Sequence, residues 1–132
     1  KFPQLSYLDI SKCSTCFKTL DGEFPNLTEL HANCLYVPQV PQDMSFFCGQ
    51  YPKLKKLYVK ELNGMLPKGL IQLEHLDASY SSIQHDDFPL DMKSLKYLNL
   101  SQTEIYSLHK EYIDHRFDKV ILGDEIDSDA ED

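Results

Sequence analysis

Glycine is scarce in this sequence: only five of the 132 residues are glycines, and none belongs to a glycine-rich loop that could cradle a phosphate. The Gly-x-Ser-x-Gly and His-Glu-x-x-His patterns of hydrolases and metalloproteases are also missing. No apolar run approaches the roughly 18 residues of a membrane-spanning helix. Lysine and arginine form no basic stripe of the kind that binds nucleic acid. We therefore expect neither catalysis nor a cofactor, and no membrane or nucleic-acid partner.

The negative charge of the chain is concentrated at its C-terminal end. The formal net charge is -8. Six of the acidic groups that contribute to it are Asp124, Glu125, Asp127, Asp129, Glu131 and Asp132. We accordingly divide the chain into one domain over residues 1–123 and an acidic tail over residues 124–132. The tail is interpreted as a solvated end, with a basic partner, or phosphorylation of Ser128 by an acidophilic kinase, as alternatives.

One pattern, Leu-x-x-Leu-x-Leu with conservative replacements, recurs through the whole domain. Its six copies begin at Leu5, Leu27, Leu54, Leu73, Leu95 and, more weakly, Phe117. These starting positions are spaced 22, 27, 19, 22 and 22 residues apart. A period near 22 with this signature is typical of a leucine-rich-repeat solenoid.

The predicted fold belongs to the α/β class. Each copy should form a short parallel strand on the concave face, with its consensus residues inward and the intervening residues outward. Loops and short helices should return along the convex face, with helical segments near residues 44–48 and 109–113 and a C-terminal cap that closes with a strand over residues 117–122. The aromatic residues of Phe24-Pro25 and Tyr51-Pro52 should fill the core between repeats, while Ser81 and Thr103 should bond backbone groups in turns.

The first copy begins almost at residue 1, and no polar cap precedes Leu5. A solenoid needs a capping repeat to cover its end. We therefore expect the domain to be the C-terminal part of a longer solenoid, or to pack against another chain.

The cysteines admit two interpretations. Cys13, Cys16, His31 and Cys34 together have a spacing that resembles a zinc site. The repeat register, however, places Cys13 in a turn and directs His31 away from the core. We favour structural thiols over zinc or a disulfide, and we expect an intracellular location, cytoplasmic or nuclear.

The residues that alternate with the inward leucines are the candidate site. They form a grid that tyrosines, which are enriched in binding hot spots, partly fill. The candidate partner-binding residues are Tyr7, Asp9, Glu29, His31, Lys56, Tyr58, Lys60, His75, Asp77, Tyr97 and Asn99. Lys56 and Lys60 flank Tyr58 and suit an acidic patch on a partner. The loop from Val37 to Cys48 is a second possible contact, and an ordinary solvated face is the alternative.

Two segments carry a resemblance to one group of leucine-rich-repeat proteins. Residues 2–10 and 47–54 resemble the irregular repeats of substrate receptors of cullin-RING ubiquitin ligases, of the F-box and nematode-expanded types. In that group the repeats hold the degradation target, so the resemblance implies target recognition within a larger multi-subunit complex.

Two other groups share features with the chain. Residues 95–105 are similar to a repeat of plant nucleotide-binding immune receptors, in which the repeat domain senses ligands. The repeat cap that runs into an acidic tail is similar to the acidic leucine-rich nuclear phosphoproteins. We expect a protein-recognition module, with a sensing domain, a phosphoprotein-like regulator and a purely structural solenoid end as alternatives.

Overall fold

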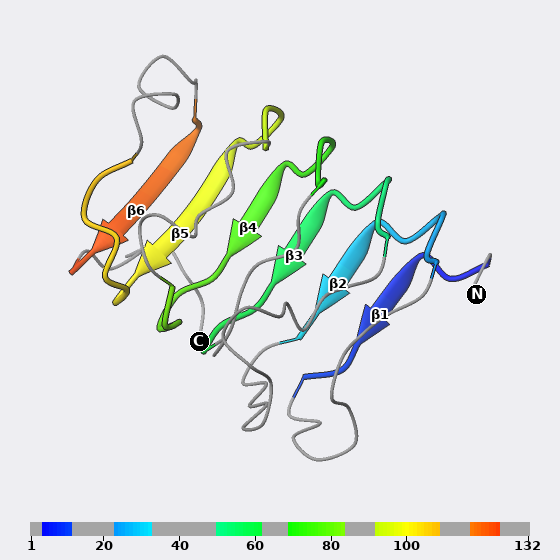
Figure 1. The fold of residues 1–132 in the computed structure, drawn as a ribbon, viewed down its shortest axis with the longest axis horizontal. Helices are drawn as coiled ribbons and strands as arrows, with labels where there is room; N and C mark the ends of the chain where they lie inside the picture. Colours follow the sequence, from blue (N-terminus) through cyan, green and yellow to red (C-terminus); the bar gives the residue numbers. More distant parts are fainter. Residues whose placement is uncertain are drawn as a thin grey trace.

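A computed structural model of the chain describes residues 4–11, 23–32, 50–61, 69–83, 92–108 and 117–124. They contain six strands: β1 (Tyr7–Asp9), β2 (Glu29–His31), β3 (Lys56–Tyr58), β4 (His75–Asp77), β5 (Tyr97–Ser101) and β6 (Lys119–Gly123). The strands lie side by side in chain order, and every neighbouring pair is parallel (Figure 1). The chain therefore returns to the same end of the sheet before each strand, which makes the architecture a parallel-strand β-solenoid.

The described residues contain no helix, and hence none that is long and apolar enough to cross a membrane. The segments for which the sequence predicts short helices, residues 44–48 and 109–113, lie outside the described ranges. The loop from Val37 to Cys48 and the acidic residues beyond Asp124 lie outside them as well.

The hydrophobic core follows the consensus positions, as the sequence predicts. The middle leucines of the four central copies, Leu30, Leu57, Leu76 and Leu98, are completely buried. The equivalent residues of the outer copies, Leu8 and Val120, are only partly buried and pack against the same cluster. Each copy thus buries its leucines against its neighbours, and the first and last copies have fewer neighbours to cover them.

Two aromatic-proline pairs form the turns that precede β2 and β3. The Leu27 amide donates to the Phe24 carbonyl at 3.3 Å, and the Leu54 amide donates to the Tyr51 carbonyl at 3.2 Å. Each bond closes a four-residue turn whose second residue is a proline, and proline presets the backbone angle required there. The turns bring the Phe24 and Tyr51 rings together in the core, stacked at 5.3 Å. The prediction that these aromatics fill the core between repeats is confirmed.

One carbonyl before each strand accepts two hydrogen bonds from the following repeat. The Thr28 carbonyl, for example, accepts from the amides of Lys55 and Lys56 at 2.9 and 3.0 Å. The Lys55 carbonyl in turn accepts from Glu74 and His75 at 2.9 and 3.0 Å. The same arrangement joins every neighbouring pair of strands from β1 to β6, so these carbonyl and amide groups satisfy one another across neighbouring repeats.

Buried hydroxyl groups secure the turns that follow the strands. Thr103 Oγ1 donates to the Leu100 carbonyl at 2.6 Å and accepts from the Ile105 amide at 3.1 Å. Ser81 Oγ donates to the Val59 carbonyl of the previous repeat at 3.1 Å. The prediction that Ser81 and Thr103 bond backbone groups in these turns is confirmed.

Replacement of Thr103 by valine tests this turn chemistry. Thr103→Val keeps the shape of the side chain but leaves two buried backbone groups without their partner, so the free energy of unfolding should fall by about 1–3 kcal/mol. Urea denaturation measures the change. The control is Thr28→Val. The Thr28 hydroxyl donates an exposed hydrogen bond to the Ser6 carbonyl at 3.1 Å, and its removal should lower the free energy of unfolding far less. Equal losses in the two variants would contradict a special role for Thr103.

Candidate functional site

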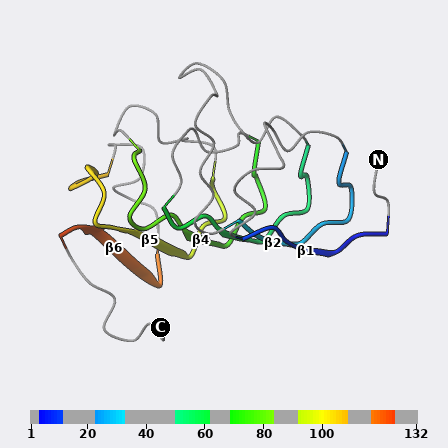
Figure 2. The same cartoon turned by 90° about the horizontal axis from the view of Figure 1, so that it is seen from below.

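The strand face is the surface formed by the side chains that alternate with the buried leucines, and the described turns rise from the opposite side of the sheet (Figure 2). The strand register arranges these side chains in two rows. The first row is Tyr7, Glu29, Lys56, His75, Tyr97 and Lys119, and the second is Asp9, His31, Tyr58, Asp77, Asn99 and Ile121.

All of the partner-binding residues predicted from the sequence occupy these rows except Lys60, which lies two residues after the end of β3. The rows also contain Lys119 and Ile121 of β6, which the sequence prediction omits because the sixth copy departs most from the repeat pattern. The second row becomes less accessible along the sheet. Asp9 on β1 is exposed, whereas Asp77, Asn99 and Ile121 are buried.

Five rings on the strand face form one continuous stack, which we call the ring ladder: Tyr7, His31, Tyr58, His75 and Tyr97. The His31 and Tyr58 rings are stacked, with centroids 4.3 Å apart and planes 12° apart. The His75 and Tyr97 rings are stacked in the same way, at 4.1 Å and 9°. Each of the five successive strands from β1 to β5 contributes one ring to the ring ladder.

Tilted contacts join the two stacked pairs to each other and to the first strand. Tyr58 meets His75 at 4.9 Å and 42°, and Tyr7 meets His31 at 5.1 Å and 40°. Each tilted contact is diagonal, because it joins a residue of one row to a residue of the other. The tilted contacts fall within the centroid distances of about 4.5–7 Å that aromatic pairs favour, and the stacked pairs lie slightly closer. The alternation in the sequence identifies all five ring residues. It does not predict that they form one stack, because the stack passes from one row to the other twice, between β1 and β2 and between β3 and β4.

In three repeats the second-row side chain also bonds the backbone that follows it. Asp9, Asp77 and Asn99 accept a hydrogen bond from the backbone amide two residues further on, at 2.9, 3.1 and 3.0 Å. Such Asx turns are a common way to end an extended segment. In the second and third repeats this position holds His31 and Tyr58, which are ring-ladder residues. Three repeats lack the Asx side chain: the second and third hold the stacked rings there, and the sixth holds Ile121.

A carboxylate fixes one of the histidine rings. Glu29 Oε2 lies 2.6 Å from His31 Nε2, and both side chains are about one-quarter exposed, at 30% and 21%. On the neighbouring strand, hydrogen bonds from the backbone amide and side chain of Ser11 hold the pKa of the Asp9 carboxyl below its usual value. The β1–β2 end of the strand face is therefore negatively charged.

Burial shifts the protonation equilibria of the two central rings. It raises the pKa of the Tyr58 phenol, and the nearby carboxylates of Glu29 and Asp77 raise it further, so the hydroxyl keeps its proton. Burial also lowers the pKa of the His75 imidazole, because the charged form loses hydration. The Asp77 carboxylate partly opposes that shift, whereas the Lys56 ammonium adds to it.

The positive charges of the strand face begin at β3. Lys56 is exposed in the first row. The Lys60 ammonium lies 4.0 Å from the Asp77 carboxylate, which also accepts hydrogen bonds from the Ser79 amide and hydroxyl. The charge beside the ring ladder therefore changes from acidic at its β1–β2 end to more basic at its middle, on β3.

Of the four residues in the zinc hypothesis, only His31 is described, and its ring belongs to the ring ladder. Cys13, Cys16 and Cys34 lie outside the described ranges. Within those ranges, no group of three or more histidine, cysteine, aspartate or glutamate residues is arranged to hold a metal ion.

Comparison with protein-family models, with curated proteins and with solved structures finds no match for this chain. The geometry of the strand face therefore carries the functional argument.

The pH dependence of stability tests the environment of His75. Because its pKa is lower in the folded protein than the ordinary value of 6.5, the unfolded chain takes up the proton first as the pH falls. His75 should therefore contribute fully to stability above about pH 6.5 and progressively less below it. His75→Phe keeps a ring but cannot titrate, so its free energy of unfolding should fall less between pH 7.5 and 5 in urea denaturation. Parallel curves for the two proteins would contradict this explanation.

A double-mutant cycle measures the strength of the stack. The unfolding free energies of His75→Ala, Tyr97→Ala and the double variant should give a coupling of about 0.5–1.5 kcal/mol, because ring stacking adds to simple burial. Tyr7 and Tyr97, at opposite ends of the ring ladder, provide the control pair, and their coupling should be close to zero. A coupling for His75 and Tyr97 no larger than that of the control would show that their stacking adds nothing.

Proposed function

We propose that this chain is a leucine-rich-repeat domain whose strand face binds a protein partner, without catalysing a reaction. The leucine-rich-repeat assignment is supported by the recurrence of the consensus in six copies. It is supported further by strands that follow that consensus in chain order, with buried leucines at equivalent positions. Solenoids of this kind characteristically use the strand side as an extended binding surface.

The continuous ring ladder is the observation that carries the binding proposal. Tyrosine offers a large contact area and a polar end while losing little conformational entropy on binding. Rings that already contact one another are ordered before a partner arrives, which further reduces the entropic penalty of association. Tyr7, at the end of the ring ladder, is 51% exposed and available for contact. The acidic groups at β1–β2 and the lysines at β3 favour a partner whose own charges are complementary.

The more specific function that we propose is recognition of a target protein within a ubiquitin ligase, in the cytoplasm or nucleus. Its support is the resemblance of residues 2–10 and 47–54 to the repeats of ligase substrate receptors. A sensing domain of an immune receptor, a regulator similar to nuclear phosphoproteins and a structural solenoid end are the rival proposals. Capture experiments distinguish between them, because each predicts a different set of bound proteins.

Affinity capture followed by mass spectrometry tests the strand face directly. The full protein is compared with the variant Tyr58→Ala/Tyr97→Ala, which removes one ring from each stacked pair. We expect at least one partner to be lost, because removal of interface hot-spot residues typically weakens binding by 2 kcal/mol or more, about thirtyfold. Cullin components among the proteins retained or lost would support the ligase assignment.

Two controls separate binding from folding. Thr103→Val should lose comparable stability while leaving the strand face intact. Ile71→Ala removes a side chain that is 59% exposed but lies outside the two rows. A partner lost from the ring-ladder variant and kept by both controls would support the proposal. An unchanged set of captured proteins would refute the strand face as the binding surface and favour a structural role.

A further inference from the structure

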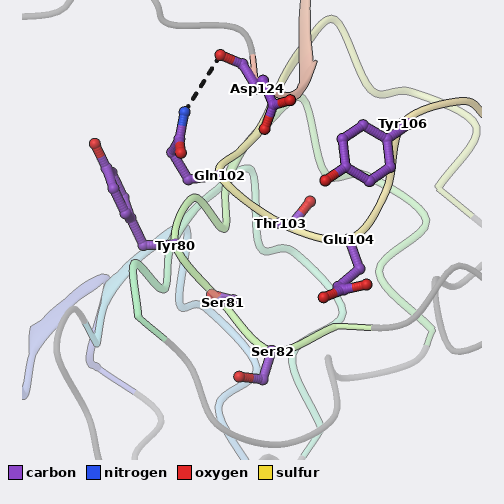
Figure 3. A pocket seen from close by; sticks show the side chains of 8 residues that line it. All are labelled: Tyr80, Ser81, Ser82, Gln102, Thr103, Glu104, Tyr106 and Asp124. Carbon is purple, nitrogen blue, oxygen red and sulfur yellow. Dashed lines mark hydrogen bonds between the residues drawn. The ribbon is translucent and has the colours of Figure 1, made fainter.

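A second candidate site lies beside the turns that follow β4 and β5 and at the end of β6. It is an open hollow of about 390 Å³, within the size range of small-ligand sites. The residues that line it are Tyr80, Ser81, Ser82, Gln102, Thr103, Glu104, Tyr106 and Asp124 (Figure 3). None of them belongs to the ring ladder, so the hollow is separate from the strand face.

An exposed aromatic ring forms one wall of the hollow. The Tyr106 side chain is 64% exposed, yet its ring lies directly against the backbone of Gly123. A Cβ atom at position 123 would come within 2.7 Å of ring atom Cε1. Gly123 also has a φ of 54°, which glycine adopts most readily. The glycine therefore lets the ring rest on the backbone and leaves most of it accessible to a ligand.

The charged groups of the hollow are carboxylates. Glu104 and Asp124 lie on either side of Tyr106 in the close view (Figure 3). The described lining residues include no lysine, arginine or histidine. The hydroxyls of Ser81 and Thr103 already bond backbone carbonyls. An accessible ring beside two carboxylates attracts cations, because the ring face and the carboxylates both carry negative electrostatic potential.

The end of β6 is tied to the turn after β5, which keeps the hollow in shape. Gln102 Nε2 donates to the Asp124 carbonyl at 3.3 Å, and the Gln102 amide donates to the Gly123 carbonyl. Residues from two different repeats thus keep fixed positions around the opening. An ordered site reduces the entropic penalty of ligand binding.

We propose that this hollow binds the guanidinium group of an arginine side chain presented by a protein. The guanidinium plane stacks on the Tyr106 ring, and its N–H groups donate to the carboxylates of Glu104 and Asp124. Arginine suits the site better than lysine, because its group is planar, weakly hydrated and able to stack and to pair with carboxylates at once. The proposal does not depend on the ring ladder, which lies elsewhere on the molecule.

Titration with N-acetyl-arginine amide, followed by NMR of the 15N-labelled full chain at low salt, tests the proposal. We expect saturable shifts confined to residues 80–82, 102–106 and 123–124, and weakened by added salt. The citrulline analogue has the same shape without the charge and should produce no such shifts. Glucose serves as an uncharged ligand of a different kind. Equal shifts from citrulline, or shifts in the hollow from glucose but not from arginine, would overturn the proposal.

Variants assign the binding to the ring and the carboxylates. Tyr106→Leu should weaken arginine binding about two- to fivefold, as the loss of an exposed cation–π contact implies, whereas Tyr106→Phe should retain it. Adding Glu104→Gln and Asp124→Asn to Tyr106→Leu should remove saturable binding. The control is Tyr7→Leu, which removes a tyrosine of the strand face that is 51% exposed and should leave the affinity unchanged. Weaker binding in that control, or none of these losses, would refute the site.

Discussion

The carbonyl group before each strand accepts two amide protons from the following repeat, and the arrangement of the whole sheet depends on this contact. Because the same pair of bonds forms at each step, as at Thr28 and Lys55, every strand meets its neighbour without a shift in register. An unshifted register places equivalent repeat positions directly beside one another. The leucines therefore align into one core on one side of the sheet, and the alternating residues align into rows on the other.

The strand face shows a conflict between local turn chemistry and ring stacking. Three repeats use an Asx side chain to bond the backbone amide two residues further on, whereas His31 and Tyr58 occupy that position in two of the other three. A residue that departs from the local rule of its fold often does so where function requires it. The departure occurs in adjacent repeats and produces a stacked pair, which is why we regard the ring ladder as a binding feature rather than as part of the scaffold.

The two ends of the sheet differ in the chemistry that they offer. At β1–β2, Asp9 is exposed and Glu29 partly exposed beside accessible rings. Towards β6 the second row is buried, and the accessible carboxylates Glu104 and Asp124 lie at the turns instead of on the strand face. The same repeat geometry thus produces two separate surfaces. Stacked rings with mixed charge occupy the strand face, while the exposed rings of Tyr80 and Tyr106 lie with two carboxylates at the turns.

The sequence by itself determined the solenoid of parallel strands, because the recurring leucines can be buried only if successive copies stack. It also determined which residues alternate with those leucines, from Tyr7 to Asn99, since strand side chains point to opposite faces in turn. Only the tertiary structure decided that five of these residues form one stack, because cross-strand contacts depend on the register and on side-chain conformation. It alone brought Tyr106 onto Gly123, because residues 17 positions apart in the sequence meet there through the pairing of β5 with β6.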